Sequence, residues 1–204
     1  ISICGVDGSG KTSICKQLAK DFSEKIIVKH KKSSMNSTNL ESIYNKNDFN
    51  DATWLKGDFA KLNGYACMFD FIYWYNSELK EIIHKKESII ITDRYALCYL
   101  SYALAIDKNI FKLIKSVLSK ENIVSPDLTI YLDADIESIN LRLQKRPDRT
   151  KSENNYVLRE CQIAYEKLID NKLNTITIDT NCEFSESYEK CKKLILDIIQ
   201  EHEN

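Results

Sequence analysis

A glycine-rich segment near the start of the chain carries the residues best suited to chemistry. Gly5-Val6-Asp7-Gly8-Ser9-Gly10-Lys11-Thr12 fits the pattern GxxxxGK[ST], follows an apolar run and opens a helical pattern. Glycines let successive backbone N–H groups turn toward phosphate oxygens, and a helix N-terminus adds positive potential there. The lysine of such a segment reaches the outer phosphates, and the hydroxyl of the serine or threonine that follows it suits Mg²⁺. The pattern predicts a phosphate-binding loop made by Gly5, Gly8, Ser9, Gly10, Lys11, Thr12 and Ser13.

Two carboxylates are expected close to the bound phosphates. Asp7 stands inside the loop, where its negative charge would be repelled by the phosphates. A water bound to Mg²⁺ or a hydroxyl of the acceptor would offset this cost by contacting the carboxylate. A turn-forming role is the alternative for Asp7. The apolar run 88–92 leads into Asp93 and Arg94, and side chains at the carboxyl end of a parallel strand face the ligand crevice. We expect Asp93 to hold Mg²⁺ through water and Arg94 to contact a phosphate, with a surface salt bridge as the alternative.

Short apolar, β-branched runs alternate with longer helical patterns along the chain. Continuous apolar runs are typical of strands covered on both faces, and their alternation with helices predicts an α/β fold with a parallel sheet. Strands are expected at 1–4, 26–30, 88–92, 128–133 and 175–179. Helices are expected at about 11–23, 65–86, 96–106, 108–120, 135–146, 152–171 and 185–202. The polar segment 31–51 is predicted to be a loop with room for one short helix.

The composition excludes several classes of protein. A length of 204 residues is that of one domain. The formal net charge of −1 excludes a strongly basic nucleic-acid binder, so no nucleic acid polymer is expected as a partner. No apolar run is long enough to span a membrane. The 7 cysteines form no CxxC pair and have no histidine at ligand spacing, which predicts reduced thiols in a cytoplasmic protein.

In combination, these segments resemble the thymidylate kinase family of nucleoside monophosphate kinases. The resemblance rests on GVDGSGKT near the start, on a strand that ends in DRY, and on PDLTIYLD followed by an arginine-rich helix. It implies a P-loop kinase fold whose five-stranded parallel sheet has the order 2-3-1-4-5 and is flanked by helices. It also implies ATP and Mg²⁺, an acceptor-binding region at about 31–86 and a lid at about 142–155, within a single domain over 1–204. Family members are often homodimers through helices near the acceptor region, and the resemblance allows this here.

Three arginines fall in the expected lid. Arg142 and Arg146 are four residues apart and share one helix face, and Arg149 follows Pro147, which ends the helix. Mobile guanidinium groups suit the charge that spreads over phosphate oxygens during phosphoryl transfer. Family members without an arginine inside the first loop carry the catalytic one in the lid, and Arg149 matches that motif best. A solvated helix face is the alternative for each of the three.

The acceptor side departs from the family pattern. Segment 28–34 reads VKHKKSS where the family has a TREPGG-like stretch, although His30 or Lys31 remains able to meet a phosphate. Segment 67–71 reads CMFDF where the family has FAADR, and no arginine precedes Arg94. The guanidinium groups that suit a monophosphate and a thymine edge are therefore missing. Lineage drift and a new specificity both account for this loss.

Aromatic residues are frequent around the missing arginines. They are compatible with core packing or, as a group, with a flat acceptor such as a base. The set comprises Phe59, Tyr65, Phe69, Phe71, Tyr73, Trp74, Tyr75, Tyr95 and Tyr99.

The residues and the resemblance favour an ATP-dependent kinase that transfers the γ-phosphoryl group to a nucleoside monophosphate, dTMP foremost, or to a related small-molecule acceptor. Lys11 and the loop amides would hold the donor, while Thr12 and Asp93 would position Mg²⁺. Asp7 would orient the acceptor, Arg94 would bind its phosphate, and the lid arginines would close over the transferring group. The alternatives are a kinase for a nucleoside or a specialised biosynthetic intermediate, and a nucleotide-binding regulatory protein with a degenerate acceptor site.

Overall fold

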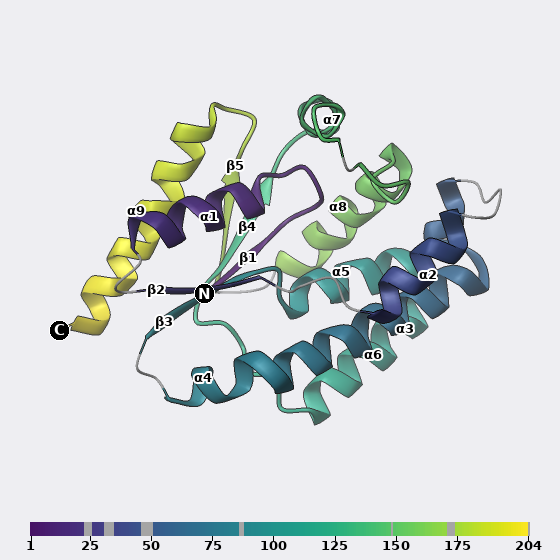
Figure 1. Cartoon of the computed structure of the whole chain (residues 1–204), viewed down its shortest axis with the longest axis horizontal. Helices are drawn as coiled ribbons and strands as arrows, with labels where there is room; N and C mark the ends of the chain where they lie inside the picture. The colour runs from purple at the N-terminus through teal and green to yellow at the C-terminus, as the bar shows by residue number, and fades with distance from the viewer. Residues whose placement is uncertain are drawn as a thin grey trace.

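A five-stranded parallel sheet lies at the centre of the molecule (Figure 1). The computed structural model describes residues 1–22, 26–30, 35–45, 51–85, 88–147, 149–170 and 174–203. The strands follow the order β2-β3-β1-β4-β5, which confirms the predicted order and the predicted fold class. They are β1 (Ser2–Cys4), β2 (Ile26–His30), β3 (Ile89–Asp93), β4 (Thr129–Asp133) and β5 (Thr175–Asp179).

The register of the sheet brings the candidate catalytic segments to one edge. Ile3 of β1 pairs with Asp93 of β3, and His30 of β2 pairs with the same Asp93. Because parallel strands all point the same way, the loop that follows β1 and the residues that end β2 and β3 meet at the carboxyl edge. The sheet is thus the element that unites residues far apart in the sequence.

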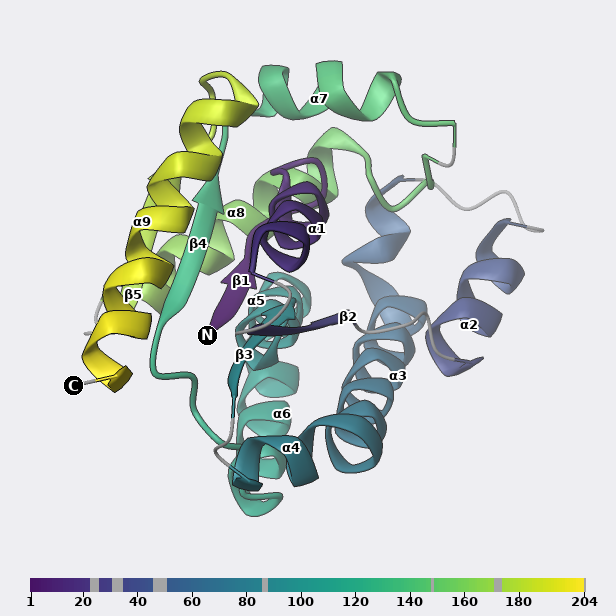
Figure 2. The ribbon, with the colours of Figure 1, turned by 60° about the vertical axis from the view of Figure 1, so that its left-hand side comes forward.

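Helices cover both faces of the sheet, because successive strand residues point to opposite sides. Ile3 is fully buried among side chains of α1 (Lys11–Asp21) and α9 (Phe184–Glu203). Cys4 is fully buried on the other face, among α5 (Ala96–Ile106), α7 (Ile136–Gln144) and α8 (Asn155–Ile169). Figure 2 shows the helices on the two sides of the strands.

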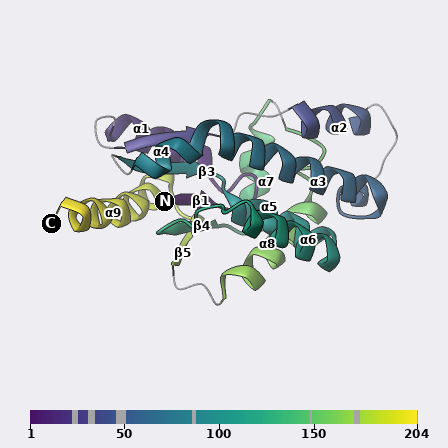
Figure 3. The same ribbon diagram turned by 90° about the horizontal axis from the view of Figure 1, so that it is seen from below.

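A second helical layer lies at the end of the molecule opposite α9 (Figures 1 and 3). Its main helices are α3 (Gly57–Trp74) and α6 (Lys108–Lys120), which pack on α5. Helix α2 (Met35–Asn45) lies against α3, and the short helix η1 (Asp51–Trp54) lies against α3 and α8. This layer contains the described part of the region that the sequence assigns to the acceptor.

The helices predicted at 11–23, 96–106, 108–120, 135–146, 152–171 and 185–202 correspond to α1 and to α5 through α9, with ends that differ by about three residues or less. Because α7 ends at Gln144, Arg146 lies beyond it, and the prediction that Arg142 and Arg146 share one helix face is wrong.

The helix expected at 65–86 is a longer run that starts at Gly57, passes through a π-helical turn η2 (Tyr75–Leu79) and ends with α4 (Lys80–Lys85). Gly57 and Gly64 weaken the helical pattern over its first turns, because glycine disfavours helix. Gly64 also lies at a close contact between helices. A Cβ on Gly64 would lie 3.0 Å from Cδ1 of Ile106, so α3 and α5 approach closely there.

Most of the aromatic residues of the acceptor region form core. Phe71 is fully buried, stacks on Tyr99 with ring centroids 4.7 Å apart, and meets Tyr95 edge to face at 5.4 Å. For five members of the set, core packing is therefore the correct interpretation, and stacking on an acceptor base is wrong: Phe71, Trp74, Tyr75, Tyr95 and Tyr99. These rings pack together with apolar side chains of α6, which explains their number.

In the described residues we find no helix with both the length and the apolar character needed to cross a bilayer. The cytoplasmic location stays a prediction.

Candidate active site

The glycine-rich segment forms a tight loop between β1 and α1. Gly5 has φ 146°, and a Cβ there would lie 2.5 Å from the carbonyl oxygen of Leu132. Gly8 has φ 84°, and a Cβ there would lie 2.9 Å from Cγ2 of Ile139. Both positions thus require glycine, because any larger residue would meet the neighbouring strand or helix in a backbone conformation it rarely adopts.

Lys11 lies under this loop and is 4% exposed. Its Nζ donates to the carbonyl oxygen of Val6 at 2.6 Å. Burial lowers the pKa of this ammonium group, the nearby Arg94 charge lowers it further, and Asp7 opposes both. The Oγ atom of Ser9 is also buried and has no hydrogen-bond partner within the described part of the chain. The loop therefore presents polar groups that protein atoms leave partly unsatisfied.

Asp93, the last residue of β3, contacts side chains of α1 and β2 at the carboxyl edge of the sheet. Its Oδ2 accepts a hydrogen bond from the hydroxyl of Thr12 at 2.7 Å, and Nδ1 of His30 lies 3.1 Å from the same oxygen. Thr12 and Ser13 are exposed in the first turn of α1. The sequence did not predict the contact of His30 with Asp93, although both end neighbouring strands, which was the available signal.

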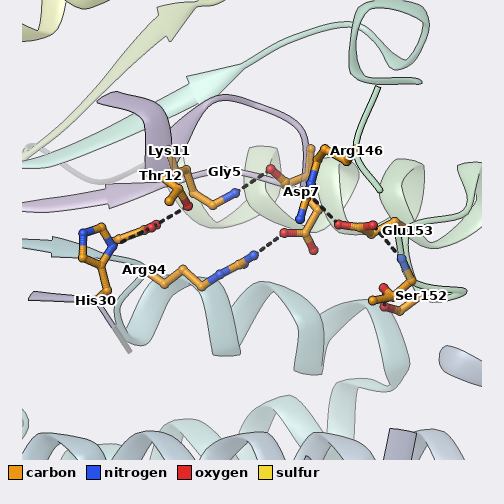
Figure 4. Close-up of polar contacts among 12 residues, drawn as sticks. Gly5, Asp7, Lys11, Thr12, His30, Arg94, Arg146, Ser152 and Glu153 are labelled. Carbon is orange, nitrogen blue, oxygen red and sulfur yellow. Dashed lines mark hydrogen bonds and ion pairs between the residues drawn. The ribbon is translucent and has the colours of Figure 1, made fainter. Parts of the chain in front are cut away.

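Asp7 and Arg94 form an ion pair across the mouth of the site (Figure 4). The two side chains are 38% and 37% exposed. Burial alone would raise the pKa of Asp7, but the charges of Arg94 and Lys11 lower it to about 2. The pair is a salt bridge, as the alternative for Arg94 expected, and it stands at the carboxyl ends of β1 and β3. The phosphate contact of Arg94 stays a prediction.

The backbone of Arg94 adds to the evidence for a functional site. Its φ is 72°, in the left-handed region that non-glycine residues seldom occupy, and its N–H donates to the carbonyl oxygen of Ile3 at 3.0 Å. Such strain costs free energy and is concentrated at functional sites. Here it turns the guanidinium group from the end of β3 toward Asp7.

Arg142 of α7 links the glycine-rich loop to the residue that follows β5. It donates to the carbonyl oxygen of Gly8 at 3.3 Å and to the backbone carbonyl of Thr180. The hydroxyl of Thr180 in turn donates to the carbonyl oxygen of Ser9 at 3.3 Å. Sequence reasoning missed Thr180, although its position directly after β5 places it at the same edge of the sheet. Arg142 therefore does not lie on a solvated helix face.

The other two arginines of the predicted lid both donate hydrogen bonds to one buried residue, Glu153. Arg146 donates to Oε1 of Glu153 at 2.9 Å, and its charge also contributes to the low pKa of Asp7. Arg149 donates to the backbone carbonyl of Glu153 at 2.9 Å and to Oδ1 of Asn140 at 3.3 Å. Of the lid arginines, Arg146 is thus the one whose charge acts on the centre of the site. Glu153 was not predicted, and Asp148 lies outside the described residues.

The region predicted to bind the acceptor contains a buried carboxylate of its own. Asp70 of α3 is 1% exposed and accepts hydrogen bonds from the first turn of α2. The donors are Nδ2 of Asn36 at 2.7 Å, the backbone N–H of Ser37 at 3.0 Å and the hydroxyl of Ser37 at 2.7 Å. Asp70 therefore ties α2 to α3. Lys31 and residues 46–50, which belong to the expected acceptor region, lie outside the described residues.

A glycine-rich loop between β1 and α1, on a parallel sheet of this order flanked by helices, is typical of the class of P-loop kinases. Comparison with known proteins makes the assignment specific. The family model described as Thymidylate kinase matches residues 3–191, so the chain belongs to the thymidylate kinase family. The protein is accordingly an ATP-dependent phosphotransferase that acts on a nucleoside monophosphate or a related small-molecule acceptor.

Individual relatives agree with this family over nearly their whole length. The chain is 29% identical to a thymidylate kinase of Mesoplasma florum, over 98% of this chain and 96% of the relative. It is also 29% identical to a thymidylate kinase of Buchnera aphidicola, over 96% and 93%. A solved structure of deoxyadenosine kinase from M. mycoides shares the fold, with a TM-score of 0.70, 15% identity, and coverage of 97% and 98%.

Proposed function

We propose that the protein transfers the γ-phosphoryl group of Mg²⁺-bound ATP to a nucleoside monophosphate, and that dTMP is the first acceptor to test. The observation that carries the proposal is the Asp7–Arg94 pair, which joins the glycine-rich loop to the residue that follows β3. A carboxylate can accept from an acceptor sugar hydroxyl, and a guanidinium group suits its phosphate. The named activity of the relatives from Mesoplasma florum and Buchnera aphidicola supports the choice of dTMP.

The donor is assigned to the glycine-rich loop. The loop amides would hold the phosphates at the N-terminus of α1, and Lys11 would turn from Val6 to the outer phosphates. The residues proposed to contact ATP are Gly5, Gly8, Ser9, Gly10, Lys11, Thr12 and Ser13. The buried Oγ of Ser9, which lacks a protein partner among the described residues, supports this assignment.

Thr12 and Asp93 suit a Mg²⁺ ion. Both offer oxygen atoms, the ligands that Mg²⁺ prefers, and they lie within hydrogen-bond distance of each other. Oδ1 of Asp93 is buried and has no hydrogen-bond partner in the described residues, so a cation or its water would satisfy it. Bound there, Mg²⁺ would neutralise charge on the ATP phosphates.

The lid, at about 142–155, is assigned to the charge that develops on the transferring group. Arg146 is the first candidate because its charge already acts on Asp7. Arg142 would support the loop through Gly8, and Arg149 would support the lid through Asn140. Closure of the lid would also exclude water and suppress ATP hydrolysis.

A nucleoside, rather than a monophosphate, is the second candidate acceptor. Arg94 is the sole arginine before Arg142, so one guanidinium group alone is available on the acceptor side of the sequence. The position where the family carries its second arginine falls at Phe71, which is buried in the core. An acceptor without a phosphate would need fewer positive charges.

An ADP-release assay with Mg²⁺ and ATP tests both candidates. The panel contains dTMP, dUMP, the other monophosphates and the unphosphorylated nucleosides, and Lys11→Ala is the inactive control. Turnover of dTMP supports the first candidate, and turnover of a nucleoside alone supports the second. No turnover on the whole panel, with ATP binding intact, would contradict both and favour a regulatory nucleotide-binding protein.

We also propose a homodimer through α3. Three large apolar side chains on this helix are exposed to solvent: Leu62 by 56%, Phe69 by 59% and Tyr73 by 73%. Exposed apolar side chains that lie together on a surface are typical of a protein–protein interface. Light scattering on the purified protein tests this, with Tyr73→Asp expected to shift the mass toward the monomer. A monomeric wild-type protein at micromolar concentration would contradict the dimer.

A further inference from the structure

Glu153 is a buried carboxylate in the loop between α7 and α8, with a side chain that is 6% exposed. Its Oε1 accepts from Nη1 of Arg146 at 2.9 Å. Its Oε2 accepts from the backbone N–H of Thr150 at 2.9 Å. Both oxygens are therefore used, as a buried carboxylate requires, because an unpaired charge away from water is costly.

The backbone of Glu153 closes the same loop. Its N–H donates to the carbonyl oxygen of Thr150 at 3.1 Å, and its carbonyl accepts from Arg149 at 2.9 Å. The next residue, Asn154, caps α8 by accepting from the backbone N–H of Val157 at 3.0 Å. Arg146, Arg149 and Thr150 are thus all bonded to Glu153, which directly precedes the N-cap of α8.

Arg146 connects this loop to the proposed reaction centre. Figure 4 shows its side chain near Asp7, with Glu153 alongside, and its charge contributes to the low pKa of Asp7. An arginine side chain loses much rotamer freedom when it is fixed in one place. If an ion pair fixes the arginine before the substrates bind, the catalytic step no longer has to include this loss of rotamer entropy.

We propose that Glu153 is a positioning residue that holds Arg146 toward Asp7, so that this guanidinium group is in place when the phosphoryl group is transferred. The inference rests on the proposed kinase function and goes beyond it by assigning a role to a residue that touches no substrate. Glu153 acts through Arg146, so its effect depends on Arg146 being present. A residue that served only folding would show no such dependence.

Steady-state kinetics with the active acceptor test this dependence. Glu153→Gln is expected to lower kcat about tenfold while it changes the KM for ATP and for the acceptor less than about twofold. In an Arg146→Ala background, Glu153→Gln should have almost no additional effect on kcat. Glu153→Asp should recover part of the loss. Glu137→Gln, which alters an exposed acid of α7, is the matched control and should equal the wild type.

Limited trypsin cleavage after Arg149 and Lys151 supplies a readout that needs no turnover. Loss of the Glu153 carboxylate should accelerate cleavage in the lid about tenfold, because local opening becomes easier. Unchanged kcat in Glu153→Gln, or additive effects with Arg146→Ala, would overturn the proposal while leaving the kinase function intact. If the wild type turns over nothing on the panel, the proposed function fails, and unchanged cleavage would then overturn the role of Glu153 independently.

Discussion

The proposed donor side and the proposed acceptor side of the site are built in different ways. On the donor side, the loop from Gly5 to Thr12 is contiguous, and its shape follows from glycines that no other residue can replace. On the acceptor side, α2 and α3 are held together by the buried Asp70 and by a core of aromatic rings. Backbone geometry thus fixes the donor side, whereas packing between distant segments fixes the acceptor side.

The largest expected effect comes from a substitution on the proposed donor side. Lys11→Ala should lower kcat/KM at least about 10³-fold, because the ammonium group is the main positive charge that reaches the outer phosphates. Lys16→Ala, an exposed lysine of the same helix, is the control and should leave turnover unchanged. The ADP-release assay measures both. A Lys11→Ala enzyme with a tenth of wild-type turnover would break the proposed division into two sides.

Arg94 sharpens the comparison because its proposed ligand is the phosphate of the acceptor. Arg94→Gln should lower kcat/KM for a monophosphate about 10–100-fold, the value of one or two lost charge-assisted hydrogen bonds. The loss should appear in the KM of the acceptor and leave the KM of ATP nearly constant. With a nucleoside acceptor the effect should be smaller. An equal increase in both KM values would show that Arg94 belongs to the donor side.

Asp70 tests whether the acceptor side depends on side-chain packing. Asp70→Ala should lower the free energy of unfolding by about 3 kcal/mol, because Asn36 and Ser37 lose their buried acceptor. Asp58→Ala, at an exposed position of the same helix, should change it by less than about 0.5 kcal/mol. Urea unfolding measures both. Equal midpoints for the two variants would refute a structural role of Asp70.

The smallest expected effect is the pH dependence due to Asp7. Its pKa is lowered to about 2 in the folded protein, so the ion pair stabilises the fold fully above the ordinary value near 3.8. This contribution is lost as the pH falls from about 4 to about 2. Because the Asp7 side chain is 38% exposed, solvent screening limits it to about 1 kcal/mol or less.

Thermal unfolding of the wild type and of Asp7→Asn between pH 2 and 7 measures this difference. The two stability curves should converge near pH 2, separate as the pH rises to about 4, and stay a constant distance apart above that. Curves that stay parallel over the whole range would mean that Asp7 has an ordinary pKa in the folded protein.

The sequence alone determined the sheet, its order through the family resemblance, and the loop that follows the first strand. These features depend on short apolar runs and on backbone requirements that neighbouring residues express. It also indicated Asp93 and Arg94, because the end of a buried parallel strand has a known place in such folds.

Only the tertiary structure decided which side chains meet. The contacts of His30 with Asp93, of Thr180 with Arg142 and of Glu153 with Arg146 join different elements. The same holds for Phe71, whose ring has no local pattern that distinguishes a core position from a binding surface. Local periodicity shows that a residue is apolar or charged, but its partner depends on how the helices pack on the sheet, and this information is spread over the whole chain.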